Sequence, residues 1–147
     1  MSSKGTSGGP PIEIDHIGIA VTSHEASHAF WEALGWDLKN VQKETVPEQK
    51  VKVAFLNTQN KASLELLEST DDSSTVAKFL EKKGPGIHHI CLRVHKIDQV
   101  LAKLKSAGVR LINEKPVMGA DQCLVAFVHP SSTGGVLVEL SEKAGRG

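Results

Sequence analysis

The chain has 147 residues, of which 39% are hydrophobic and 23% charged, as is usual for a compact globular domain. Lysine plus arginine and aspartate plus glutamate each number 17, so the formal charge is zero, and neither a nucleic-acid nor a membrane-surface partner is expected. No apolar stretch is long enough to span a bilayer. The two cysteines form no Cys-x-x-Cys pair, which favours a reduced, cytoplasmic setting.

The ends of the chain differ in composition from its middle. Residues 1–11 are rich in serine, glycine and proline and lack an apolar core, which predicts a disordered tail and not a signal peptide. Residues 12–142 are expected to form a single domain, followed by a tail at 143–147. Within the domain we expect a first module at about 12–70, a linking helix at about 73–83 and a second module at about 86–142.

The two modules are predicted because the sequence repeats itself. When His89 is placed on His16, a separation of 73 residues, the apolar positions that follow the two histidines coincide. Gly35 and Gly108 have the same separation, and two pairs of apolar segments agree with it to within one residue: 53–55 with 125–127, and 64–66 with 138–140. Four landmarks at one separation indicate two copies of one unit.

In the first copy, residues 12–21 alternate as a strand does. Thr22 and Glu25 form a capping-box pattern for a helix that should end at Gly35. Strands are expected at 36–41, 46–57 and 63–68. The helix is predicted to bury two residues, Phe30 and Leu34, against three strand residues, Ile17, Ile19 and Val21.

The second copy repeats this plan. Residues 87–94 are expected to form a strand, and Asp98 to cap a helix that ends at Gly108. Three more strands are expected at 109–113, 122–129 and 135–141. Leu101 and Leu104 should pack on Ile90, Leu92 and Val94. The fold class is therefore α+β, with two tandem βαβββ modules forming a curved mixed sheet around a trough and helices on the outer face.

Four side chains are predicted to meet in this trough. Glu65 follows His16 by 49 residues, Glu139 follows His89 by 50, and alternation turns all four away from the helices. Two imidazoles and two carboxylates suit a divalent metal cofactor, with Co²⁺ expected first and Mn²⁺, Ni²⁺, Zn²⁺ or Fe²⁺ as alternatives. Any one of these residues alone would more often be structural, so the prediction depends on the repeat.

Other histidines and a cysteine were weighed by the same alternation. His88, equivalent to Asp15 in the repeat, is expected to face the helices and to be structural. His24 is expected at the surface, whereas His129 is compatible with either location. Cys91 should point into the trough as a small buried residue, because no neighbouring group would activate its thiol.

The paired modules resemble the vicinal oxygen chelate superfamily and, within it, the methylmalonyl-CoA epimerases. The resemblance covers about 12–142, and its most specific segments are IDHIGIAV (14–21), VPEQ (46–49) leading into VAFL (53–56), LELLE (64–68), GIHHI (86–90), FVHPS (127–131) and GGVLVEL (134–140). It implies that the metal ligands are His16, His89 and Glu139, with Gln or Glu at the position of Glu65. Some members carry a glutamate base where this chain has Val53.

The resemblance implies an enzyme that interconverts (2R)- and (2S)-methylmalonyl-CoA by removing the α-proton through an enediolate, with a small acyl-CoA as partner and a homodimeric assembly. Glu139 and Glu48 are the candidate acid/base residues, Glu48 on its nearness in sequence to Val53 alone. Two alternatives stay open: a glyoxalase I-type lyase, which uses a similar His/Glu set, and a non-catalytic small-molecule-binding protein of the same fold. An iron-dependent ring-cleaving dioxygenase ranks last.

Overall fold

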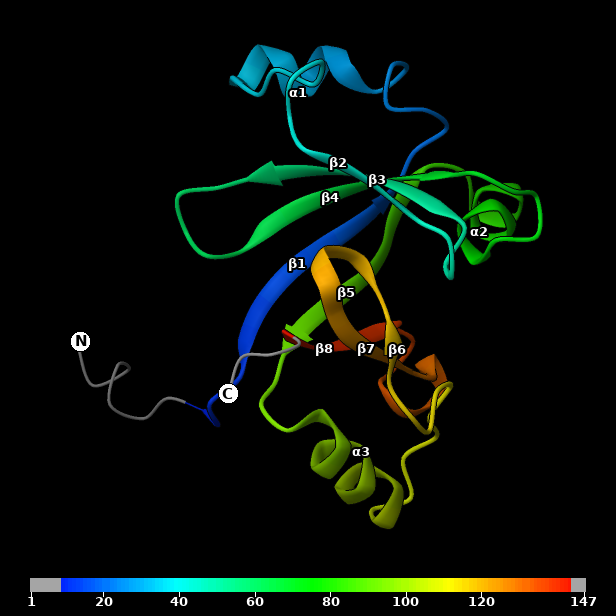
Figure 1. Cartoon of the computed structure of the whole chain (residues 1–147). Helices are drawn as coiled ribbons and strands as arrows, with labels where there is room; N and C mark the ends of the chain where they lie inside the picture. Colours follow the sequence, from blue (N-terminus) through cyan, green and yellow to red (C-terminus); the bar gives the residue numbers. More distant parts are fainter. Residues whose placement is uncertain (1–8, 144–147) are drawn as a thin grey trace.

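The computed structural model describes residues 9–143, so the predicted tails lie largely outside the described residues. Within that range, eight strands form one strongly curved sheet in the order β2-β3-β4-β1-β5-β8-β7-β6 (Figure 1). The first strands of the two modules, β1 (Glu13–Ala20) and β5 (Gly86–Arg93), pair antiparallel at its centre. The modules therefore join through the strands that carry His16 and His89.

Each module has the same topology on its own side of this seam. β1 pairs parallel with the last strand of its module, and β5 does the same in the second module. The two remaining strands of each module extend the sheet outward in antiparallel pairs. The predicted pair of βαβββ modules is thereby confirmed. The outer strands are β2 (Lys43–Val46), β3 (Val51–Asn57), β4 (Ser63–Ser69), β6 (Val117–Met118), β7 (Cys123–Val128) and β8 (Val138–Lys143).

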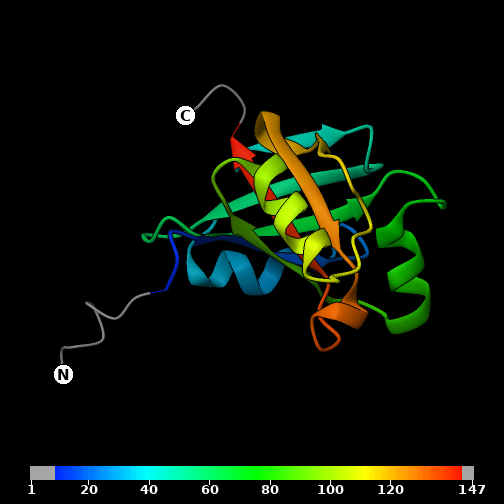
Figure 2. The ribbon, with the colours of Figure 1, turned by 90° about the horizontal axis from the view of Figure 1, so that it is seen from below.

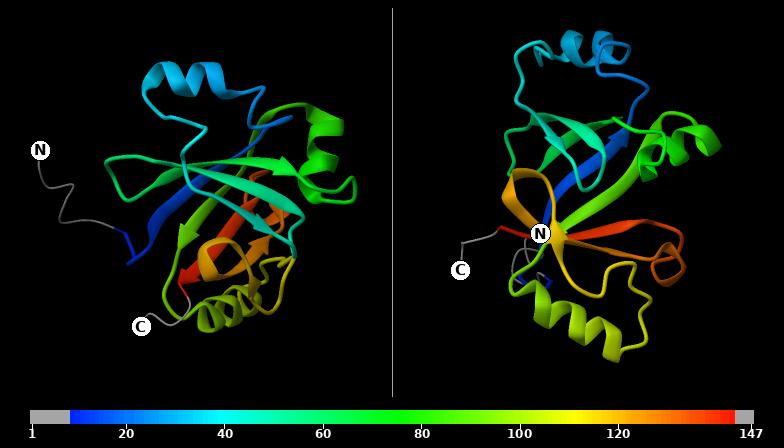
Figure 3. Two further views of the ribbon diagram at one scale, coloured as in Figure 1. Left: turned by 45° about the horizontal axis from the view of Figure 1, so that its top comes forward. Right: turned by 45° about the vertical axis from the view of Figure 1, so that its right-hand side comes forward.

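The three α-helices of the described range occupy different places around the sheet. α1 (His28–Leu34) and α3 (Ile97–Ser106) lie at opposite ends of the molecule on its outer side (Figure 3). α3 lies across the strands of its own module (Figure 2) and buries Ile97 and Leu101. α2 (Thr75–Lys83) connects the modules, and its buried residue Val76 belongs to the apolar cluster on the concave side. None of these helices has the length and hydropathy that crossing a bilayer requires.

The packing of the second module agrees with the prediction, but that of the first does not. Leu101 and Leu104 share one core cluster with Leu92 and Val94, as expected. Phe30 and Leu34, in contrast, are each 61% exposed, and α1 contains no buried residue. Trp31 packs against the sheet in their place, beside Ile19 and Val21. The predicted register of this helix is wrong because the helix begins later than the capping pattern indicates.

Both helix starts are held by contacts that the local sequence does not reveal. α1 begins at His28, well after Thr22, because the preceding backbone forms a turn in which Ser23 Oγ accepts from Ala26 N at 2.9 Å. α3 begins at Ile97, one residue before its predicted cap, Asp98. In each module a glutamate of the last strand accepts from the backbone ahead of the helix.

Several predicted strands also differ from the structure. Residues 36–41 form no strand, because Trp36 and Leu38 pack under α1 from an irregular segment. The expected strand at 109–113 is reduced to one bridge, between Leu111 and Val128. The long strand expected at 46–57 is interrupted by a turn at 47–50, which makes β2 and β3 a hairpin. β6 is too short to leave a periodic signal in the sequence.

Candidate metal centre

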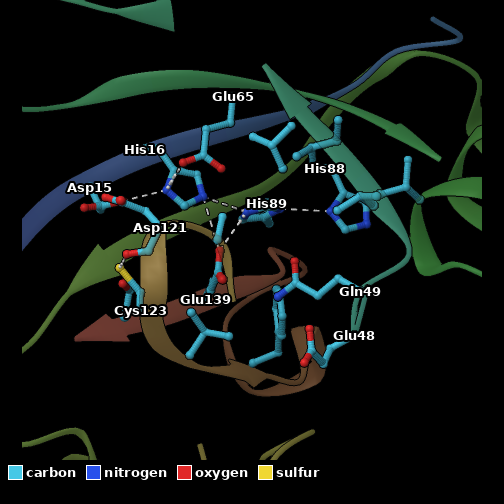
Figure 4. Close-up of a pocket in the computed structure, with 18 of the residues that line it drawn as sticks. Asp15, His16, Glu48, Gln49, Glu65, His88, His89, Asp121, Cys123 and Glu139 are labelled. Carbon is cyan, nitrogen blue, oxygen red and sulfur yellow. Dashed lines mark hydrogen bonds and ion pairs between the residues drawn. The ribbon is translucent and has the colours of Figure 1, made fainter. Parts of the chain in front are cut away.

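The concave side of the sheet encloses a cavity of about 700 Å³. Side chains of both modules and of α2 line it, and the two histidines of the central seam lie at its base (Figure 4). His16 comes from β1 and His89 from β5, and both are buried. The predicted trough and the direction of its histidines therefore agree with the structure.

The two imidazoles face each other across the seam. Their Nε2 atoms lie 3.0 Å apart, and the rings are nearly perpendicular, at 85°. Gly18 lies directly opposite His89 in the β1–β5 register. A Cβ atom at Gly18 would overlap the His89 ring, so this position has room only for glycine. The small residues of β1 thus make the space that the second histidine occupies.

Glu139 completes a compact group of donors. Its Oε1 lies 3.2 Å from His16 Nε2 and 2.9 Å from His89 Nε2, and the side chain is buried on β8. Donor atoms of these three residues all lie within 4.8 Å of one another. Two imidazole nitrogens and a carboxylate oxygen that converge in this way fit a divalent transition metal and leave coordination positions for water or substrate.

The fourth predicted ligand, Glu65, lies beside this group on a different side. It is buried on β4, but its Oε2 is 3.1 Å from His16 Nδ1, the nitrogen that faces away from His89. Glu65 is therefore not one of the three donors that converge. The structure brings it into contact with His16, and its role as a ligand stays a prediction.

The two glutamates differ in electrostatic environment. Burial disfavours a charge on Glu139, but hydrogen bonds from His16 and His89 outweigh it and lower the pKa of Glu139 to about 2. Burial raises the pKa of Glu65 to about 8, and the charge of Glu139 adds to this rise. Burial also opposes a charged His16, yet hydrogen bonding, led by Asp15, raises the pKa of His16. The site therefore holds protons that a bound cation would displace.

Asp15 and His88 are the functional residues that alternation missed. Both line the cavity, whereas both were expected to face the helices. His16 Nδ1 donates to Asp15 Oδ2 at 2.7 Å, and His88 Nδ1 lies 2.9 Å from His89 Nδ1. The reason is a pair of irregularities in the β1–β5 register, one at Asp15 and one at His88. A bulge redirects a side chain to the other face of a sheet, as here in both halves.

These two residues hold the rings from behind, each in its own way. Asp15 is fixed by Arg93, which donates from Nε at 3.0 Å and from Nη2. His88 packs against the ring of Phe79 of α2, with centroids 5.2 Å apart. Burial, with the nearby charge of His89, lowers the pKa of His88 to about 4, so this imidazole stays neutral near pH 7. Residues behind a ligand set its orientation and basicity.

The remaining predicted residues take simpler places. Cys91 is fully buried, and burial raises the pKa of its thiol, in agreement with an inert small residue. Glu48 lines the cavity from the exposed β2–β3 turn, while Val53 is buried in the cavity wall. His129 lies outside the cavity lining and accepts from Ser131 N at 3.0 Å. His24, expected at the surface, is in fact buried.

Comparisons with known proteins agree with this architecture. The family model of the Glyoxalase/Bleomycin resistance protein/Dioxygenase superfamily matches residues 15–127. The mitochondrial methylmalonyl-CoA epimerase of Bos taurus is 37% identical over 131 residues, which are 88% of this chain and 73% of that protein. The crystal structure of methylmalonyl-CoA epimerase from Mycobacterium tuberculosis is 38% identical with a TM-score of 0.81, covering 89% of this chain and 87% of that one.

A solved methylmalonyl-CoA epimerase in complex with methylmalonyl-CoA and NH4+ is 35% identical to this chain, with a TM-score of 0.80 over 90% of this chain and 94% of that one. The similarity thus extends over nearly the whole described range, and it includes both modules. The chain therefore belongs to the methylmalonyl-CoA epimerase family within the Glyoxalase/Bleomycin resistance protein/Dioxygenase superfamily.

Proposed function

We propose that this protein is a metal-dependent epimerase that interconverts (2R)- and (2S)-methylmalonyl-CoA. The observation that carries the proposal is the convergence of His16, His89 and Glu139 at the base of a cavity, in a chain of the methylmalonyl-CoA epimerase family. A cavity of about 700 Å³ is in the range that holds a small-molecule ligand. The acyl end of a CoA thioester fits such a space, with the rest of CoA outside it.

The donor set indicates where the metal would bind. His16, His89 and Glu139 would hold a divalent ion, for which we propose Co²⁺ first, and Glu65 would be the additional ligand. When bound, such an ion acts as a Lewis acid that stabilises negative charge on the oxygens of the substrate. Asp15 and His88 would keep the two imidazoles in the orientation that presents Nε2.

Inversion at the α-carbon requires two groups that exchange protons on opposite faces of the substrate. We propose Glu139 for one face and Glu48, at the rim of the cavity, for the other. One carboxylate takes the α-proton, the electron pair moves onto the thioester oxygen as an enediolate forms, and the other carboxylic acid returns a proton to the opposite face. The assignment of Glu48 has support only from its place in the cavity lining.

Incubation of one epimer with Co²⁺-loaded protein in D₂O tests this function. The opposite epimer should appear with deuterium at its α-carbon, because a carboxyl proton exchanges with solvent between the two transfers. A loaded protein that gives neither product nor deuterium incorporation would refute the epimerase. The glutathione hemithioacetal of methylglyoxal is then the substrate to try, since a glyoxalase I-type lyase is the alternative.

A pair of variants tests the proposed second base. Glu48→Gln should slow epimerisation by about 10²-fold or more while the metal content stays at the wild-type value. Glu81→Gln, on the exposed side of α2, is the matched control and should leave the rate unchanged. Wild-type turnover by Glu48→Gln would show that another group serves the second face.

We also propose a homodimer in a cytoplasmic setting. Support for the dimer comes from large apolar side chains that the single chain leaves more than half exposed, among them Ile14, Phe30, Leu34 and Ile87. Support for the setting comes from Cys91 and Cys123, which are both free. Light scattering on a size-exclusion column tests the dimer, and a monomer at micromolar concentration would contradict it.

A further inference from the structure

The cavity is bounded on one side by a contact between the two modules that the metal centre does not explain. Glu44 of β2 accepts from Asp121 N at 2.8 Å through Oε1. Asp121 belongs to a short 3-10 helix, η2 (Ala120–Gln122), in which both Asp121 and Gln122 have a positive φ. The β2–β3 turn of the first module thus meets η2 of the second module beside the cavity.

Gln49, in this turn, carries an amide group without a partner. Its Nε2 is buried and makes no hydrogen bond, a condition that only one other side-chain atom of residues 9–143 shares, His24 Nδ1. Of these two residues only Gln49 lines the cavity, and its carboxamide is directed into the pocket (Figure 4). A buried N–H without an acceptor is costly, and each case in a folded protein calls for an explanation.

The surrounding structure keeps this amide in place without satisfying it. Gln49 N donates to Val46 O at 3.2 Å within a turn that Lys50 completes with a positive φ. On the other side lies Gly119, where a Cβ atom would come within 3.4 Å of Gln49 Nε2 and 2.8 Å of Val125 Cγ1. The amide is therefore seated between a rigid turn and the backbone of Gly119, and its free donor is left for a ligand.

We propose that the Gln49 amide donates a hydrogen bond to the free carboxylate of the bound acyl thioester and so selects malonyl-type substrates. This inference rests on the proposed function and adds a residue that determines specificity. A carboxylate is the stronger acceptor, since hydrogen bonds to charged groups exceed neutral ones. A site built around a donor also rejects an analogue that lacks the acceptor, because the donor then stays unpaired.

The test compares two thioesters that differ in that carboxylate. Dissociation constants of methylmalonyl-CoA and propionyl-CoA are measured by calorimetry on Co²⁺-loaded protein, for wild type, Gln49→Met and Gln49→Glu. Gln49→Met should weaken methylmalonyl-CoA binding by about 10- to 100-fold and leave propionyl-CoA within about 2-fold. Gln49→Glu should weaken methylmalonyl-CoA binding further, because it places a second carboxylate against the first. Gln59→Met, at an exposed position outside the cavity lining, is the matched control.

A measurement without any ligand supplies a second readout. Gln49→Met replaces an unpaired buried amide by an apolar group of similar length, so the free protein should unfold at a higher temperature than wild type. A residue that only maintained the turn would lower this temperature. A gain in stability together with a loss of carboxylate selectivity is the result expected of a binding residue.

The outcomes separate this inference from the function on which it rests. Equal losses for both thioesters, or no loss for either, would overturn the assignment of Gln49 to the carboxylate. A wild-type protein that binds methylmalonyl-CoA selectively but does not epimerise it would refute the function and leave the role of Gln49 standing. If wild type binds neither thioester, both proposals are wrong.

Discussion

The two modules share a topology but begin their helices differently. In the second module Glu142 accepts from Lys96 N and Ile97 N, both at 3.0 Å, and α3 starts at once. In the first module Glu68 accepts from His24 N at 2.7 Å, at the equivalent place, yet the chain makes a turn before α1. A carboxylate from the last strand thus anchors both loops, and it supports a long buried helix in only one of them.

The residues at this equivalent position explain part of the difference. Ile97 is fully buried in the core beneath α3. His24, 73 residues earlier, is also buried, but its ring turns toward the sheet, where Nε2 donates to Leu66 O at 2.9 Å. An aliphatic side chain at this point anchors a helix by packing. A histidine anchors a turn by hydrogen bonding and leaves Nδ1 without a partner.

The metal centre shows the same kind of divergence. Glu65 and Glu139 are equivalent in the repeat, but Glu139 contacts the Nε2 atoms of both histidines, whereas Glu65 contacts only Nδ1 of His16. Their pKa values are accordingly displaced in opposite directions. Duplication supplies equivalent positions, and the neighbours of each position decide what its side chain does.

The largest effect should come from separating these two glutamates. Glu139→Gln is expected to weaken Co²⁺ binding by more than about 100-fold, because changes behind a ligand already cost about 10- to 100-fold. Glu65→Gln should stay within about 10-fold of wild type, since an amide keeps an oxygen donor and resembles the protonated acid that a raised pKa favours. Competition with a chelator measures both affinities, and equal losses would contradict the comparison.

The two outer helices should differ strongly in their contribution to stability. Leu101→Ala removes a side chain that is 2% exposed under α3 and should lower the free energy of unfolding by about 2–5 kcal/mol. Phe30→Ala, at a position that is 61% exposed on α1, should cost less than about 1 kcal/mol. Urea denaturation of the apo-protein gives both values. A large loss for Phe30→Ala would mean that a partner surface covers α1.

A smaller difference is expected between the two loop anchors. Glu142→Gln weakens a carboxylate contact at the start of α3 and should cost about 1 kcal/mol, as the loss of a helix cap does. Glu68→Gln should cost less, because the turn that it holds is not followed directly by a helix. Thermal unfolding of both variants provides the measurement, and the reverse order would contradict this account.

The smallest effect concerns pH and His24. Burial lowers the pKa of His24 below its ordinary value of 6.5, so the unfolded chain binds more protons at this residue than the folded protein does. The stability that neutral His24 contributes is present above pH 6.5 and is lost as the pH falls through the lowered pKa. His24→Ile, which copies the second module, should lose stability less steeply on acidification, by at most one proton. His95→Gln, at an exposed position, is the control.

The sequence predicted the parts of the site that follow the repeat. His16, His89 and Glu139 came from alternation along regular strands, and these three residues do converge. Asp15 and His88 were placed on the wrong face because each lies at a register irregularity, and a period of two cannot show where one occurs. The 73-residue separation of these two residues was the available signal.

The helices were harder to predict for a related reason. Strand positions depend on a short period that the chain itself carries, but the start of α1 depends on Glu68, 44 residues away from His24. A Thr22–Glu25 capping box is a local pattern, and the contact of His24 with Glu68 and Leu66 overrides it. Gln49 escaped notice because an unpaired donor is defined by what is missing around it.

The central β1–β5 pairing also determines when the donor set can form during folding. His16 and His89 are 73 residues apart, and each module closes on itself only through a parallel pair, β1 with β4 and β5 with β8. Contacts between distant residues carry a large loop-closure cost and form slowly. The three donors, drawn from β1, β5 and β8, therefore come together at the end of folding. A metal ion joins a finished sheet, and we expect it to slow unfolding without accelerating refolding.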